Sequence, residues 1–599
     1  MKDAFINRKY VIMALIVLAS FGLIIRLFVI QVVKDSYRLS ADNNVLRYIT
    51  QYPARGIIYD RNGKMIVNNQ AAYDLMVVPA QTSKIDTTGF CNLIGISKEL
   101  FNERMKAAIN YSRRAPSVFL KQLSNETYAR LQEKMFLYPG FYVQPRTLRK
   151  YLKPVGAHIL GYVSEVDDGI IRKDPYYKSG DYIGKLGIEE AYEKELRGRR
   201  GVKIYLVDVY SRIKGSYMEG KMDTLAVQGE NIVSGIDLDL QEYGELLMKN
   251  KRGSIVAIEP KTGEVLTLVS SPNYDPGLLV GRVRSDNYTV LSADTIKPLF
   301  NRALMASYPP GSTFKLVNGL IALQEQVITP STLFACHNGY LGVACHSHFS
   351  PLNLEDAIMV SCNSYFCQAY RRILENPKYT TISSAFETWK RYVNEFGFGS
   401  KLGTDFVNEL PGFIPATTYF DKYYGMNRWK ATTVLSMAIG QGEVGATPLQ
   451  MANTTAAIAN RGYFYTPHIV KSVGEEHKID QLFVTKHSIS IDTANFEKIV
   501  LGMEAVVKGG TGTVAALKDI IVCGKTGTAQ NPHGKDHSIF IAFAPKDNPK
   551  IAIVVVVENA GFGSTYAAPI ASLMIEKYLK GEVTNKERER SMLNLNLMQ

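Results

Sequence analysis

Three short motifs in this 599-residue chain combine serine and lysine in an order that favours acyl transfer. Ser312-Thr-Phe-Lys315 comes first, Ser361-Cys-Asn363 second and Lys525-Thr-Gly-Thr528 third. A serine hydroxyl is a poor nucleophile until a neighbouring base takes its proton. A lysine becomes that base when burial or a nearby positive charge lowers its pKa. The motifs therefore predict a serine nucleophile in the first motif, with its lysine as the base and the lysine of the third motif as the nearby charge.

The residues around the motifs predict the elements that hold them. Ser312 follows Tyr308-Pro-Pro-Gly311, which favours a helix start. Lys315 comes three residues later, so it shares the helical face of Ser312. The N–H of a residue at a helix N-terminus is free to donate to a developing oxyanion. The third motif follows the apolar run Ile520-Ile-Val-Cys523 and is predicted to form a strand edge with a second N–H, where Gly527 lets a substrate backbone lie close.

Each motif also has a second match elsewhere, so the interpretation depends on order and context. The second matches are Ser211–Lys214, Ser285-Asp-Asn287 and Lys261-Thr-Gly263. We interpret the last as the turn of a hairpin, the second as a polar loop, and Ser211–Lys214 as part of a first region far from the other motifs. The first set is therefore taken as functional.

The region that carries the motifs is predicted to be an α+β domain. Its four predicted strands lie in pairs near the two ends of the region: Ser254–Ile258, Glu264–Val269, His537–Ala544 and Ile551–Val557. Helical stretches dominate from Thr313 to Asn460, and Ala568–Leu579 is predicted to be a closing helix. Strands at both ends with helices between them imply one sheet built from both ends of the segment.

The flanking segments give three further expectations. Asn62-Gly63 between Ile57–Tyr59 and Met65–Val67 predicts a tight β-hairpin. Gly184–Gly201 is predicted to hold one amphipathic helix with a Gly-rich, basic end. Lys580–Gln599 is polar and is expected to be a loose tail.

Composition limits the class of protein. Apolar residues make up 46% and charged residues 21%, which excludes a mostly disordered chain, and a mean hydropathy of -0.07 excludes a polytopic membrane protein. The net charge of +13 is spread over the length, so it is no signature of nucleic-acid binding and fits contact with anionic lipid or an acidic polymer at least as well. Six cysteines are too few for a disulfide framework.

One N-terminal segment is long and apolar enough to cross a membrane. Tyr10–Val33 holds one charge, Arg26, and as a helix would span about 36 Å. Lys2, Arg8 and Lys9 precede it, so the short N-terminal end is expected to be cytoplasmic and the remaining ~560 residues to lie outside. The alternative is a cleaved signal peptide, but the apolar stretch is longer than usual and no clear cleavage site follows. The sequence predicts a single-pass anchor.

The three motifs together are the signature of penicillin-binding proteins and class A β-lactamases. The chain resembles the class B penicillin-binding proteins over nearly its whole length, most closely their rod-elongation type, penicillin-binding protein 2. The matches outside the motifs are interpreted as structural, and they are Arg55-Gly56, Asp60-Arg61, Gly63, Gly187-Ile-Glu189, Tyr192, Leu196, Gly198, Gly201, Ile439–Gly442 and Thr447–Gln450. The elongation type is indicated by Gly524–Gln530, by Phe540–Pro545 and by the short C-terminal end.

The resemblance implies an α+β architecture in several parts. A single transmembrane helix is followed by a mixed α/β pedestal of the dimerisation type, then by a transpeptidase domain with a central antiparallel sheet and a helical subdomain. The expected parts are a cytoplasmic end (1–9), the transmembrane helix (10–33), the pedestal (34–235), the transpeptidase domain (236–580) and a polar tail (581–599).

The resemblance also implies a D,D-transpeptidase that joins peptidoglycan stem peptides. Ser312 would attack the carbonyl of the penultimate D-Ala, with Lys315 as general base. Ser361 would relay a proton to the leaving amine, and Asn363 would bind the donor peptide. An amine of a second stem peptide would then resolve the acyl-enzyme, and β-lactams would acylate the same serine and stay.

The third motif is implied to bind substrate. Lys525 would stabilise charge, Thr526 and Thr528 would bind the substrate carboxylate, and Gly527 would allow close approach. The N–H groups of Ser312 and Thr528 would form the oxyanion hole. No cofactor is expected for catalysis.

The implied partners are a SEDS-family glycosyltransferase and elongation scaffold proteins, with the first region as the contact surface and no nucleic acid. The alternatives are a septal class B transpeptidase, a D,D-carboxypeptidase, a β-lactamase, and a non-catalytic activator of a glycosyltransferase. A membrane anchor and a long first region argue against a β-lactamase, and three intact motifs argue against a purely structural role.

A cluster of cysteine and histidine predicts a structural metal site. Of the six cysteines and nine histidines, seven fall between residues 336 and 367: Cys336, His337, Cys345, His346, His348, Cys362 and Cys367. Cys thiolates and neutral imidazoles are the ligands that Zn²⁺ prefers. Cys336, Cys345, His348 and Cys362 are the expected set, with His346 or His337 as alternatives to His348. A Cys336–Cys345 disulfide and free thiols remain the other possibilities, and the resemblance supports a metal only in part because the ligand types differ.

Overall fold

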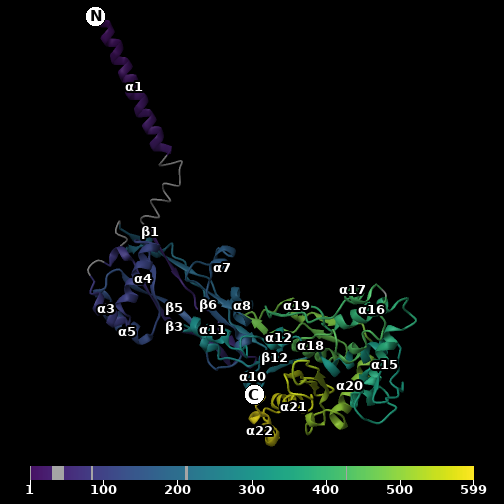
Figure 1. Ribbon diagram of the computed structural model, residues 1–599. Coiled ribbons are helices and arrows are strands. Elements are labelled where there is room, and N and C mark those ends of the chain that lie inside the picture. The colour runs from purple at the N-terminus through teal and green to yellow at the C-terminus, as the bar shows by residue number, and fades with distance from the viewer. Residues whose placement is uncertain (1, 30–45, 83–84, 209–212, 427, 599) are drawn as a thin grey trace. The chain divides into compact units, whose positions relative to one another are not determined.

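The computed structural model describes residues 2–29, 46–82, 85–208, 213–426 and 428–598 (Figure 1). The chain divides into two compact units. The first comprises residues 1–55, 71–147 and 198–229, and the second comprises residues 56–70, 148–197 and 230–599. The second unit contains all three motifs.

The N-terminal helix α1 extends from Lys2 to Phe28. Its segment Arg8–Phe28 has a mean hydropathy of 2.6, and the most apolar part of this segment has no buried residue in the structure. The helix is therefore long and apolar enough to cross a membrane. The end of the predicted span, residues 30–33, lies outside the described residues.

The first unit is a mixed α/β body with an aromatic core. β1 (Leu46–Gln51), β8 (Gly201–Val207) and β9 (Ile213–Ser216) form one antiparallel sheet, and β4 (Ser117–Leu123) pairs with the second half of β3. α3 (Thr87–Ile94), α4 (Lys98–Tyr111) and α5 (Asn125–Lys134) each begin at a capping side chain, namely Asp86, Ser97 and Ser124. The core that they cover contains Phe90, Phe101, Phe119 and Phe141.

The second unit opens with the predicted hairpin, which the structure confirms. β2 (Ile58–Tyr59) pairs antiparallel with the start of β3 (Met65–Val77). The Asp60 carboxylate closes the turn by accepting from the N–H groups of Asn62 and Lys64 at 2.9 and 2.7 Å. β10 (Ile232–Ser234) continues this sheet beside β2, and β16 (Val470–Val473) pairs with β10.

The single helix predicted over Gly184–Gly201 is wrong. The segment contains the end of β7 (Tyr182–Lys185), two one-turn helices, α8 (Gly187–Ala191) and α9 (Glu193–Leu196), and the start of β8. Its acidic residues point inward, because Glu189 is buried against Arg149 (2.5 Å) and Glu193 accepts from the Gly184 N–H (2.8 Å). These buried partners override the amphipathic pattern that the sequence suggested.

The centre of the second unit is the predicted sheet made by both ends of the region. Its five antiparallel strands run in the order β12–β11–β20–β19–β18, with bounds β11 (Gly253–Ile258), β12 (Val265–Ser271), β18 (Cys523–Ala529), β19 (His537–Ala544) and β20 (Ile551–Val557). Alternate residues of β20 enter two different apolar cores, as expected for a strand buried on both faces. α18 (Pro448–Ala459) packs on one face, and α10 (Leu238–Met248) and α21 (Ala567–Lys580) pack on the other (Figure 1).

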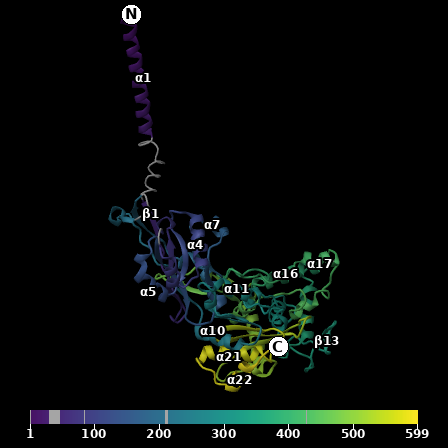
Figure 2. The ribbon, with the colours of Figure 1, turned by 60° about the vertical axis from the view of Figure 1, so that its left-hand side comes forward.

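Helices fill the region between the two halves of the sheet, as predicted. The longer ones are α13 (Lys315–Gln324), α15 (Asn363–Leu374), α16 (Ile382–Glu395), α17 (Thr417–Tyr424) and α20 (Thr493–Gly509). The other helices are α6 (Ala157–Leu160), α7 (Asp168–Lys173), α11 (Arg284–Ala293), α12 (Arg302–Met305), α14 (Leu354–Met359) and α19 (Gln481–Val484), of which α6 and α7 precede the central sheet in sequence. The remaining strands are β5 (Phe141–Tyr151), β6 (Tyr162–Glu165), β13 (Gly339–Tyr340), β14 (Val343–Ala344), β15 (Tyr463–Tyr465) and β17 (Lys486–Ser488). β13 lies at the edge of the unit, away from α10 (Figure 2).

Two expectations about non-catalytic segments are wrong. Ser285–Asn287 is not a loop but the first turn of α11. The C-terminal tail is not loose, because α22 (Lys586–Asn594) buries Met592 and its Glu589 accepts from the Tyr243 hydroxyl at 2.9 Å. The turn at Lys261–Gly263 is confirmed between β11 and β12, while residues 209–212 lie outside the described residues.

Candidate active site

Ser312 lies in a 3₁₀ turn, Gly311–Phe314, that leads directly into α13. Gly311 has a φ of +57°, and a Cβ there would come within 2.6 Å of the Thr528 carbonyl oxygen. Only glycine fits this position without strain, because the turn packs directly against β18. The nucleophile segment and the third motif are therefore held together by backbone contact.

Ser361 lies between α14 and α15 and has a φ of +58°, a conformation that L-residues seldom adopt. Two lysine side chains converge on it. Lys315 Nζ donates to the Ser361 carbonyl (2.7 Å) and hydroxyl (3.2 Å) and to Asn363 Oδ1 (2.6 Å). Lys525 Nζ donates to the same Ser361 hydroxyl at 2.8 Å. The second motif is thus the meeting point of the other two.

The environment of the two lysines lowers the pKa of both amines. Both side chains are fully buried. Burial is the main cause that lowers the pKa of Lys315 to about 8. Burial and then the charge of Lys315 lower the pKa of Lys525 well below its ordinary value. A buried amine of this kind is able to accept a proton near neutral pH.

The third motif occupies β18, the edge strand of the central sheet, in register with β19. The Gln441 side chain donates to the Thr528 carbonyl at 2.9 Å from the side away from β19. Because the N–H and C=O of a residue in an extended strand point the same way, the Thr528 N–H also faces the open edge. Thr526 contacts Thr511 through their hydroxyls at 2.7 Å.

The reason given above for Gly527 is wrong. A Cβ at Gly527 would meet Thr313 Cγ2 at 2.9 Å, and Ile539 Cβ and the Pro310 carbonyl at 3.2 Å. The glycine is required by the chain's own packing between the nucleophile turn and the sheet.

A cavity of about 370 Å³ opens between these elements. Five predicted site residues line it, and they are Ser312, Ser361, Asn363, Thr526 and Thr528. Lys315, Lys525 and Gly527 lie buried behind its wall. Nine further lining residues were not among the predicted catalytic or substrate-binding residues, and they are His346, Ile439, Gln441, Thr511, Gln530, Asp536, Phe562, Gly563 and Ser564. Ile439, Gln441 and Gln530 fall in segments that the family resemblance covers, and His346 was an alternative metal ligand, whereas the other five follow no motif.

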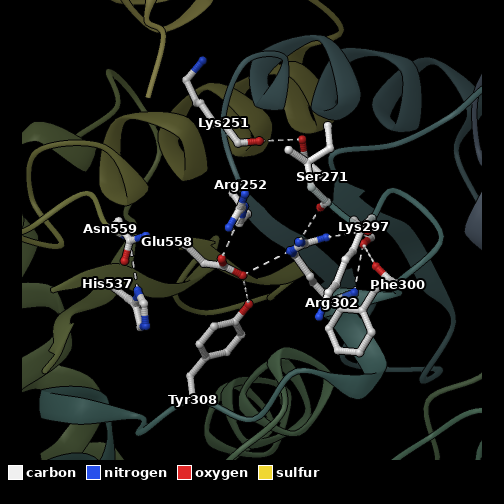
Figure 3. A network of polar contacts seen from close by, with 12 residues as sticks. Lys251, Arg252, Ser271, Lys297, Phe300, Arg302, Tyr308, His537, Glu558 and Asn559 are labelled. Atoms are coloured by element: carbon white, nitrogen blue, oxygen red, sulfur yellow. Dashed lines mark hydrogen bonds and ion pairs between the residues drawn. The ribbon is translucent and has the colours of Figure 1, made fainter. Parts of the chain in front are cut away.

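A network of polar contacts anchors the segment that precedes the nucleophile (Figure 3). Glu558, just after β20, accepts from the Tyr308 hydroxyl at 2.7 Å and from Arg302 Nε at 3.2 Å. Tyr308 is also paired through its backbone with Ala446. This network fixes the approach to Ser312 relative to the end of β20.

The predicted metal ligands lie together beside the second motif. The ligand atoms of Cys336, Cys345, His348 and Cys362 all lie within 4.8 Å of one another. Cys345 Sγ is 3.4 Å from His348 Nε2 and 3.9 Å from Cys362 Sγ. All six cysteines of the chain are free thiols in the structure.

The surroundings of the cluster fit a metal-binding donor set. His348 Nδ1 bonds to the Phe349 carbonyl at 2.7 Å, so it carries the proton and Nε2 presents its lone pair to the sulfur atoms. The N–H groups of Asn363 and Tyr365 donate to Cys345 Sγ (3.2 Å) and Cys362 Sγ (3.3 Å). Three sulfurs and one imidazole form a closed set of the kind that structural zinc sites use. The alternative ligand His346 contacts Cys345 and also lines the cavity.

Comparison with known proteins gives two family matches. Residues 253–576 match the penicillin-binding protein transpeptidase domain, and residues 50–234 match the penicillin-binding protein dimerisation domain. A relative in Haemophilus influenzae named peptidoglycan D,D-transpeptidase MrdA is 31% identical, over 98% of this chain and 94% of its own.

Two solved structures resemble the chain along most of its length. A complex of penicillin-binding protein PBP2 with MreC from Helicobacter pylori has a TM-score of 0.72 at 26% identity, and covers 90% of this chain and 99% of its own. A structure on the coordination of polymerization and crosslinking by a peptidoglycan synthase complex has a TM-score of 0.70 at 25% identity, and covers 96% and 99%.

Proposed function

The chain belongs to the penicillin-binding proteins with a transpeptidase domain, and from this premise we propose that it is the peptidoglycan D,D-transpeptidase of cell-wall elongation. The observation that carries the proposal is the convergence of Lys315 and Lys525 on the hydroxyl of Ser361 beside Ser312. A nucleophile, a buried amine and a hydroxyl relay in one cavity are the parts that serine acyl transfer requires.

In the first step, the Ser312 hydroxyl attacks the carbonyl of the penultimate D-Ala of a donor stem peptide. A C–O bond forms, and Lys315 takes the hydroxyl proton. The N–H groups of Ser312 and Thr528 stabilise the oxyanion. The contacts of Lys315 and Lys525 with Ser361 give a path for a proton to the leaving nitrogen, the C–N bond breaks, and terminal D-Ala departs.

In the second step, an amine of another stem peptide attacks the ester. A new C–N bond forms, the C–O bond to Ser312 breaks, and the proton lost by the amine returns through Ser361 and Lys315 to the serine. During the first step, before D-Ala departs, Thr526 and Thr528 bind the donor carboxylate and Asn363 binds the donor backbone, and all three residues line the cavity. A β-lactam follows the first step and leaves a stable ester.

Labelling with a fluorescent penicillin tests this function. The full-length chain in detergent is labelled, digested and mapped. We expect the label on Ser312, complete loss of the label and of cross-linking in Ser312→Ala, and no loss in Ser285→Ala, which alters the second match to the middle motif in α11. Labelling and cross-linking that both survive in Ser312→Ala would show that the proposal is wrong.

The apolar helix α1 supports a single-pass anchor, with the catalytic unit outside the cytoplasm. The PBP2 relative of known structure binds MreC, and another neighbour belongs to a peptidoglycan synthase complex. We propose that the first unit of this chain contacts a scaffold protein and a SEDS-family glycosyltransferase.

We also propose that Cys336, Cys345, His348 and Cys362 bind one structural Zn²⁺. The metal would join the loop before the second motif to the start of α15, and would act on folding and on the placement of Ser361. Two observations support this proposal. The four ligand atoms lie close together, and His348 Nε2 directs its lone pair at the other three.

Metal analysis of the purified chain tests the zinc proposal. We expect close to one equivalent of zinc, lost in Cys345→Ser and retained in Cys367→Ser, since Cys367 is buried outside the ligand set. Less than about a tenth of an equivalent, together with a Cys336–Cys345 disulfide found by mass spectrometry, would contradict it.

A further inference from the structure

The end of the cavity beyond Thr528 is a wall built from two loops. One loop, residues 530–536, joins β18 to β19, and the other, residues 558–564, follows β20. Asn531 donates to Asn559 Oδ1 at 2.7 Å, and the Gly561 N–H donates to the Asp536 carbonyl at 2.7 Å. Figure 3 shows how Glu558 at the base of the second loop is in turn held by Arg302 and Tyr308. The wall is therefore fixed to the nucleophile segment before any substrate binds.

The cavity runs along β18. Side chains alternate in a strand, so Thr526 and Thr528 project to the same side of β18, and both line the cavity. Gln530, just past the end of the strand, lines it as well. Asp536 and Phe562 line it too, and both belong to the two loops of the wall. The lining thus extends from the proposed carboxylate site to this wall.

The position of the donor peptide follows from this geometry, and this step rests on the proposed function. The terminal carboxylate lies against Thr526 and Thr528, and the attacked carbonyl lies next to Ser312. An extended peptide advances about 3.3 Å per residue. The residue before the penultimate D-Ala therefore lies past Thr528, beside Gln530 and Asp536.

Asp536 carries the one carboxylate among the described residues that line the cavity. Its Oδ1 accepts from the Asn531 N–H at 3.2 Å, which orients the group within the loop. A negative charge there disfavours an acidic side chain and favours a cationic one. Cross-linking joins two copies of the same kind of stem peptide, and the acceptor copy must offer a free amine. The donor copy therefore carries the same amine.

We propose that Asp536 binds the side-chain ammonium of the donor stem peptide, on the residue that precedes the penultimate D-Ala. In this role Asp536 selects donors whose amine is still free. It takes no part in bond making, and its contribution is to the binding of the donor and to the position of the attacked carbonyl.

Release of D-Ala from two synthetic peptides tests the proposal with the full-length chain in detergent. Both are Nα-acetyl-L-Lys-D-Ala-D-Ala, one with a free ε-amine and one acetylated there. We expect kcat/KM to favour the free amine about tenfold in the wild-type chain, the scale of a partly exposed charge-assisted hydrogen bond. Asp536→Asn should remove the preference, because the amide still accepts from Asn531 but carries no charge. Asp547→Asn, in the exposed turn between β19 and β20, should keep it.

A second measurement separates this inference from the function itself. Benzylpenicillin has no amine at this place, so its acylation of Ser312 should be unchanged in Asp536→Asn. Suppose that benzylpenicillin acylates the wild-type chain normally, but that this chain releases D-Ala from the two peptides at equal rates, or from neither. Either result overturns the inference and leaves the proposed function standing. A preference that persists in Asp536→Asn overturns it as well. If benzylpenicillin fails to acylate the wild-type chain, the proposed function itself is wrong.

Discussion

The two walls of the cavity are held in place by different kinds of interaction. The sheet wall, β18, is in backbone register with β19 along its whole length, and six of its seven residues are buried. The opposite wall contains Ser361, whose φ of +58° costs about 1–3 kcal/mol of backbone strain. The loop beside it has only the two-residue strands β13 and β14 as regular structure. Side chains hold this second wall.

The second wall is held by a small number of contacts, and most of them involve a cysteine sulfur or the Asn363 side chain. Asn363 donates its side-chain amide to the Ala344 carbonyl at 2.7 Å and its N–H to Cys345 Sγ. Cys362 caps α15. The backbone hydrogen bonds between two strands form with many different side chains, whereas a cluster of sulfur ligands is lost when almost any of its side chains is replaced. The two walls should therefore differ in their response to equally small substitutions.

The largest effect is expected at the residue that joins the nucleophile helix to the second wall. Lys315→Ala removes the base and three hydrogen bonds to Ser361 and Asn363. Acylation by benzylpenicillin should fall by about 10²–10⁴-fold, the usual contribution of a positioned base. Stopped-flow acylation rates measure this. An acylation rate within the error of the wild-type rate would mean that the amine does not act on Ser312.

The second prediction compares the walls directly with a matched pair of cysteine variants. Cys345→Ala alters the sulfur cluster, and Cys523→Ala makes the same change at a fully buried position of β18. We expect Cys345→Ala to reduce acylation about 10–100-fold, because it removes the sulfur that accepts from the Asn363 N–H and one ligand of the proposed zinc site. Cys523→Ala should lower the unfolding temperature and leave the acylation rate unchanged. Equal losses of rate in both variants would erase the distinction between the walls.

The sheet wall was predictable from sequence, and the second wall only in part. β19 and β20 follow from apolar runs of strand length, and their predicted bounds agree with the structure because both faces of the sheet are buried. β18 was predicted from the position of the third motif after an apolar run, and the motif does lie in this edge strand. The composition of the cluster loop predicts a group of ligands, and the four chosen atoms do lie together. Its backbone path was not predictable, since it depends on contacts such as the one between Asn363 and Cys345.

The failures have a common physical origin. The segment around Glu189 has the pattern of an amphipathic helix, but its acids are buried with Arg149 and backbone donors. The tail is polar in sequence, yet Met592 and Glu589 find partners on other helices. Asp536 and Phe562 enter the cavity from turns that no periodic pattern marks. Each depends on a partner far away in sequence, which local patterns do not report.

The third prediction uses the pH dependence of acylation to identify the amine that accepts the proton of Ser312. Burial lowers the pKa of Lys315 to about 8. Only the neutral amine accepts a proton, so the acylation rate should rise about tenfold per pH unit below that value and level off above it. Lys251 is a control, because burial also lowers its pKa to about 8 and it contacts the carbonyl of Leu595 in the tail. Lys251→Met should keep the profile, and a profile that shifts with this variant would assign the titration elsewhere.

The smallest effect is expected behind the sheet wall. α22 packs against α10 and α21, on the face of the sheet opposite α18, and buries Met592 there. Met592→Ala removes apolar contacts but no backbone pairing of β18, so the unfolding midpoint should fall by about 2–4 °C while acylation stays unchanged. Met598→Ala, at a 37% exposed position, is the matched control and should shift neither quantity. Thermal unfolding and acylation are measured on the same samples. A reduced acylation rate in Met592→Ala would contradict this prediction. It would mean that the sheet wall depends on remote side chains as much as the second wall does, and not mainly on its own backbone hydrogen bonds.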